Sequence, residues 1–72
     1  MITYQLYEQN SGLNLTDPIY SKKEILERYK ELKEKYERLL GKKTFMENYN
    51  ILIKVIKEDF YSYEEFLGDD YE

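Results

Sequence analysis

The first residues of the chain alternate between apolar and polar side chains, as in a β-strand. Residues 2–7 are rich in β-forming types and alternate with a period of two. A turn-forming cluster occupies residues 10–12, and residues 13–16 can return as a second strand. Pro18 then interrupts any regular element. We therefore predict a small β-hairpin or arm over residues 1–20.

An apolar stripe at helical spacing runs through residues 22–40. Its members follow one another at intervals of four, three, four and three residues: Ile25, Tyr29, Leu32, Tyr36 and Leu39. Ser21 and Glu24 have the spacing of a capping box, and Gly41 is the type of residue that ends a helix. The pattern predicts a helix over residues 22–40.

Residues 45–60 fit two structures. On a helix, most of their apolar side chains fall in one arc: Phe45, Met46, Tyr49, Leu52, Ile53, Ile56 and Phe60. Thr44 and Glu47 repeat the capping-box spacing ahead of that arc. The β-branched residues Ile51, Ile53 and Val55 also alternate, which is typical of a strand. We take the helix as the main prediction and a strand over residues 49–57 as the alternative.

The expected fold class follows from these elements. Ser62 and Glu65 form a third capping box, which predicts a short helix within residues 62–72. The main prediction is a mainly α fold of one domain over residues 1–72, with an N-terminal β-hairpin, an antiparallel pair of helices and a short C-terminal helix. The alternative is an α+β fold in the order ββαβ(α).

The composition argues against an enzyme. The chain has no His and no Cys, which excludes Cys–His and Ser–His nucleophile pairs, thiolate zinc sites and disulfides. Its three glycines are isolated, so there is no glycine-rich phosphate loop. We expect a non-enzymatic protein with no catalytic residues, cofactor or metal. We also expect a cytoplasmic location, because the N-terminus lacks a signal-peptide pattern and no apolar run approaches the length of a membrane span.

The formal net charge of −4 is unevenly distributed. Residues 58–72 contain seven acids and no base, whereas residues 1–57 carry a net charge of +3. The acids are interleaved with aromatic residues, and aromatic side chains often anchor protein interfaces. The predicted partner-binding residues are Glu58, Asp59, Tyr61, Tyr63, Glu64, Glu65, Asp69, Asp70 and Tyr71. The competing interpretation is a solvated acidic end whose aromatic residues fold back onto the core.

The acidic and aromatic segment over residues 58–72, joined to a Cys-free and Tyr-rich domain, resembles small acidic inhibitors encoded by phages. Anti-CRISPR proteins and other DNA-mimic anti-defence proteins belong to this group. The resemblance implies a larger protein as partner, whose nucleic-acid-binding groove the acidic surface would occupy. Such inhibitors share no common fold or residue signature, so the resemblance transfers no residue roles.

Two other functions are open. A structural or regulatory homodimer could be built on helices 22–40 and 45–60. Direct binding to nucleic acid could use the basic residues in and just after the first helix: Lys22, Lys23, Arg28, Lys30, Lys33, Lys35, Arg38, Lys42 and Lys43. Glutamates interspersed at ion-pairing distance favour a solvated face there instead.

Overall fold

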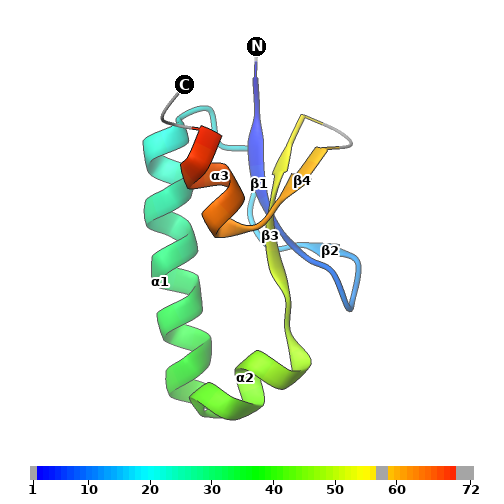
Figure 1. Ribbon diagram of the computed structural model, residues 1–72, viewed down its shortest axis with the longest axis vertical. Helices are drawn as coiled ribbons and strands as arrows, with labels where there is room; N and C mark the ends of the chain where they lie inside the picture. The colour runs from blue at the N-terminus through cyan, green and yellow to red at the C-terminus, as the bar shows by residue number, and fades with distance from the viewer. Residues whose placement is uncertain (1, 57–58, 70–72) are drawn as a thin grey trace.

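The computed structural model describes residues 2–56 and 59–69, and it shows an α+β fold (Figure 1). The elements in chain order are β1 (Tyr4–Glu8), β2 (Leu13–Asn14), α1 (Lys22–Leu40), α2 (Lys42–Asn48), β3 (Ile51–Val55), β4 (Asp59–Tyr61) and α3 (Tyr63–Asp69). The predicted helix over residues 22–40, the N-terminal hairpin and the short final helix are confirmed. The mainly α fold class is wrong, because a sheet rather than a helix pair organises the chain.

Within the described residues, four antiparallel strands form one sheet in the order β2-β1-β3-β4. β1 and β3 are its central pair, and their register places Leu6 opposite Ile53 and Tyr7 opposite Leu52. α1 and α3 lie on the same side of this sheet, and α2 links the far end of α1 to β3 (Figure 1). The two central strands therefore join an early and a late segment of the chain.

The predicted helix over residues 45–60 is replaced by the end of α2, then β3 and β4. α2 starts at Lys42, before the expected Thr44 cap, and the chain turns extended at Tyr49 with φ −128° and ψ 139°. Ile51 and Ile53 are buried while Leu52 between them is half-buried, which is the alternation of a strand. The dense β-branched residues favour this outcome once β1 supplies a hydrogen-bonding partner. The alternative prediction of a strand was the better one, although it lacked β4 and the separate α2.

The core lies between the sheet and the helices. Its buried apolar residues are Leu6, Ile19, Ile25, Phe45, Ile51, Ile53 and Phe66. α1 is held at its start by Ser21, whose hydroxyl accepts a hydrogen bond from the Glu24 N–H at 3.2 Å. It ends at Gly41, which has φ 89° and donates its N–H to the Glu37 carbonyl. Both ends are therefore fixed by local residues.

Glu8, at the end of β1, is a buried charge satisfied by backbone groups. Its side chain is 2% exposed, and its carboxylate accepts hydrogen bonds from the N–H groups of Asn10 at 3.1 Å, Ser11 at 2.8 Å and Asn50 at 2.9 Å. Burial raises the pKa of Glu8, but these hydrogen bonds outweigh it and lower the pKa below 4.5. One carboxylate thus ties the β1–β2 turn to the start of β3, 42 positions away.

Replacing Glu8 with Gln should lower the free energy of unfolding at neutral pH by about 1.5–3 kcal/mol, because charged hydrogen bonds are lost. The pKa of Glu8 is lower in the folded state than in the unfolded state. The carboxylate therefore contributes to the free energy of unfolding above pH 4.5, and this contribution is lost as the pH falls from 4.5 through the folded-state pKa. Urea denaturation of both proteins across this range should show the difference shrinking in acid. Glu47→Gln, at an exposed site on α2, is the control. If the wild type and the Glu8 variant differed in stability by the same amount at neutral and acid pH, the role given to the Glu8 carboxylate would be contradicted.

Candidate interaction surface

The acidic and aromatic end predicted from the sequence forms β4 and α3. β4 holds Asp59 and Tyr61, and α3 holds Tyr63, Glu64, Glu65 and, at its end, Asp69. Three other predicted contact residues lie outside the described residues: Glu58, Asp70 and Tyr71. The described members are therefore carried by regular elements that pack on the core.

Tyr61 and Tyr63, the described tyrosines of this segment, face the body of the protein. Tyr61 lies against Phe66 of the core, with ring centroids 6.4 Å apart. Tyr63 stacks on Tyr29 of α1 at 4.6 Å, with 17° between the ring planes. Both residues are half-buried and pack against the hydrophobic core. These two rings hold α3 in place, as the competing interpretation of the sequence expected of the aromatic residues.

Three acids of the segment whose side chains are described lie at the surface. Asp59, Glu64 and Glu65 are all exposed. Glu65 accepts a hydrogen bond from the Ser62 N–H at 2.9 Å, and its own N–H donates to the Ser62 hydroxyl, so the predicted capping box is formed. The hydrogen bonds with the backbone and hydroxyl of Ser62 lower the pKa of Glu65. This carboxylate is therefore fixed in position immediately after the end of β4.

Glu64 affects the titration of Tyr29, one member of the stacked tyrosine pair. Burial raises the pKa of Tyr29 above 10.0, and the negative charge of Glu64 raises it further, with smaller effects from Tyr63 and Glu37. The junction between α1 and α3 therefore combines stacked rings with carboxylates. The negative charge of Glu64 there favours the neutral form of the Tyr29 phenol.

The opposite face of the sheet carries an apolar patch that the sequence analysis missed. Tyr7 of β1 and Phe60 of β4 touch across β3, with ring centroids 4.7 Å apart, and Leu52 of β3 is paired with Tyr7. Phe60 is 42% exposed. The helix predicted over residues 45–60 had placed Phe60 in a buried arc, which concealed this patch. Residues 59–61 show no alternation of polar and apolar types in the sequence, so no local signal revealed the patch.

Polar side chains border the apolar patch on the same face. The Lys54 ammonium of β3 reaches the Asn14 side-chain oxygen of β2 at 3.5 Å, passing over β1. Leu6 and Ile53, which neighbour Tyr7 and Leu52 along the strands, point into the core. α1 and α3 therefore lie on the other face of the sheet and leave this patch uncovered (Figure 1). Half-apolar faces of this kind are usual for antiparallel sheets and also serve as interaction surfaces.

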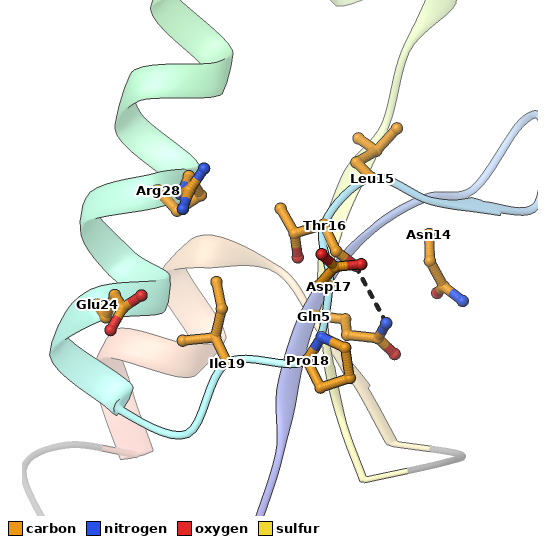
Figure 2. A pocket seen from close by; sticks show the side chains of 9 residues that line it. All are labelled: Gln5, Asn14, Leu15, Thr16, Asp17, Pro18, Ile19, Glu24 and Arg28. Atoms are coloured by element: carbon orange, nitrogen blue, oxygen red, sulfur yellow. Dashed lines mark hydrogen bonds between the residues drawn. The ribbon is translucent and has the colours of Figure 1, made fainter.

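A groove of about 610 Å³ lies between α1 and the loop that follows β2 (Figure 2). The loop is pinned to β1, because Gln5 donates its side-chain N–H to the Thr16 carbonyl at 3.1 Å. Asp17 on the loop and Glu24 and Arg28 on α1 line the groove, and all three are exposed. The groove therefore presents exposed charges of both signs, and ion pairs at such exposed positions are weak.

Two features are absent from the part of the chain that the structure describes: a metal-binding cluster and a membrane-spanning helix. There, no three acidic, His or Cys side chains gather as a metal site would require. Within the same residues, no helix combines the length and the apolar character needed to cross a membrane.

Comparison of the chain with protein-family models, with curated proteins and with solved structures gives no match. Any functional proposal therefore rests on the surfaces described above.

Replacing Glu64 with Gln should lower the pKa of Tyr29 toward 10.0, because it removes a negative charge that opposes phenolate formation. An alkaline titration followed by NMR of ¹³C-labelled tyrosine rings measures this pKa. Glu27→Gln, at an exposed position on the same helix as Tyr29, should leave the titration unchanged. An unchanged or raised Tyr29 pKa in the Glu64 variant would contradict the α1–α3 junction described here.

Proposed function

We propose that this chain is a non-enzymatic, cytoplasmic protein that binds and inhibits or modulates a larger protein. The observation that carries the proposal is the exposure of Asp59, Glu64 and Glu65 in a segment without a single base. Exposed acids of one sign attract Lys and Arg, and a partner that binds nucleic acid presents those residues in its groove. A phage anti-defence protein, such as an anti-CRISPR protein, is the most concrete form of this function.

The structure changes which residues would anchor such a complex. Tyr61 and Tyr63 pack on the core and do not serve as anchors for a partner. The exposed acids attract the partner, which makes association fast and sensitive to salt. Phe60 takes the role of aromatic anchor, because it is exposed and neighbours Asp59 in β4.

Reversing two of the exposed acids should weaken partner binding without unfolding the protein. Immobilised full-length protein is used to capture partners from bacterial lysate, and a captured protein is then tested for loss of DNA binding. The double variant Asp59→Lys/Glu64→Lys should lose at least about tenfold in affinity, because two attractive contacts become repulsive. The matched variant Glu27→Lys/Glu47→Lys makes the same charge change at exposed sites on α1 and α2 and should bind normally.

The result that would overturn the proposal is equal capture by both double variants, with circular dichroism showing that both are folded. Capture that does not fall as salt concentration rises would contradict the charge-based mode of binding.

A homodimer is the second candidate, and the uncovered patch of Tyr7, Leu52 and Phe60 favours it. The predicted pairing of helices 22–40 and 45–60 no longer applies, because residues 45–60 do not form one helix. If the patch makes a dimer, Phe60→Lys should convert a dimer to a monomer in sedimentation equilibrium, because it places a charge in an apolar contact. A wild-type protein that stays monomeric at high concentration would exclude this function.

A further inference from the structure

β4 is an outer strand of the sheet, and its outer edge is open. β3 pairs with one side of it, and no strand within residues 2–56 and 59–69 pairs with the other. Such an edge presents N–H and carbonyl groups that can accept an additional strand. The opposite edge of the sheet is partly covered. After the two residues of β2, the chain continues beside β1: the Leu15 N–H donates to the Leu6 carbonyl, and Ile19 forms a β-bridge with Tyr4.

The two sides of the β4 edge have different chemistry. Phe60 points to the uncovered face, where its ring meets Tyr7. Asp59 and Tyr61 point to the helix side, because successive residues of a strand alternate, and Tyr61 packs there against Phe66. The Glu65 carboxylate sits at the end of the same strand, bonded to the Ser62 N–H. One side of the edge is therefore aromatic, and the other side carries the carboxylates of Asp59 and Glu65.

Charge determines which strand fits this edge. A second copy of the chain paired through β4 would bring Asp59 and Glu65 of both copies into one small region, and like charges at that distance repel. Basic side chains would complement the same carboxylates. Within the described residues, Asp59 and Glu65 form no ion pair with a base of this chain. The occupant favoured by charge is a segment of a different, basic protein.

We propose that the outer edge of β4 binds an extended partner segment in which basic and apolar residues alternate. The basic side chains lie on the helix side, beside Asp59 and Glu65, and the apolar ones lie on the Phe60 side. The alternation follows from the two-residue period of a strand. This inference rests on the proposed protein-binding function and specifies the partner's chemistry and the mode of contact.

Capped synthetic peptides of seven residues provide the probe, titrated into ¹⁵N-labelled full-length protein. One peptide alternates Lys and Val, a second has the same composition with Lys and Val in separate blocks, and a third alternates Glu and Val. A fourth is the Lys/Val peptide methylated on every backbone nitrogen, which keeps its charge and removes its main-chain donors on both edges. The measured quantities are the dissociation constant and the residues whose amide signals shift.

The proposal predicts tightest binding of the unmethylated alternating Lys/Val peptide, with shifts centred on residues 59–65. Removing two charges by Asp59→Asn/Glu65→Gln should weaken it about fivefold, as for two exposed ion pairs, while Gln keeps the oxygen that caps α3. Phe60→Ala should weaken it as well. The control Glu27→Gln/Glu47→Gln removes two exposed charges elsewhere and should have no effect.

Three outcomes would overturn the inference: equal affinity for the methylated or block peptide, preference for the Glu/Val peptide, or shifts that centre on the groove of Figure 2. Absence of binding by every peptide would overturn it too. None of these results decides the proposed function, because lysate capture with the Asp59→Lys/Glu64→Lys variant tests that function separately.

Discussion

The pairing of β1 with β3 is the interaction on which the rest of the structure depends. It joins five residues near the N-terminus to five in the second half of the chain, and its register sets which side chains enter the core. Leu6 and Ile53, both fully buried, lie on the covered side, while Tyr7 and Leu52 lie on the open side. β4 then pairs with β3, and α3 packs against both. The Glu8 carboxylate secures the same junction through backbone hydrogen bonds.

The abundance of tyrosine has a structural explanation in this small fold. Few apolar residues are fully buried, and a ring of half-buried tyrosines surrounds them: Tyr4, Tyr29, Tyr36, Tyr49, Tyr61 and Tyr63. A tyrosine can bury its ring while its hydroxyl stays near water, so it extends a core that is too small for more aliphatic residues. Tyr61 and Tyr63 of the predicted binding surface therefore pack on the core. Its described residues that face solvent are Asp59, Glu64 and Glu65, and Phe60 beside them is exposed too.

Local signals in the sequence were sufficient for the elements that depend on local contacts. Ser21 and Gly41 bound α1, and Ser62 with Glu65 begins α3, because caps involve neighbouring residues. Residues 51–55 were assigned to a helix because their partner strand is distant in the sequence, and helical and alternating patterns coincide there. The role of Glu8 was hidden for the same reason, since one of its donors is 42 positions away. The exposure of Asp59, Glu64 and Glu65 agrees with the charge pattern, whereas Phe60 emerged only with β4.

The uncovered patch and the open β4 edge exist only if residues 51–61 form two strands. Isotope-edited NOE spectroscopy of the full-length protein tests this directly. The account predicts contacts between the backbones of residues 4–8 and 51–55, and between residues 53–55 and 59–61. Continuous helical contacts between each residue and the third one along, through residues 45–60, would contradict it.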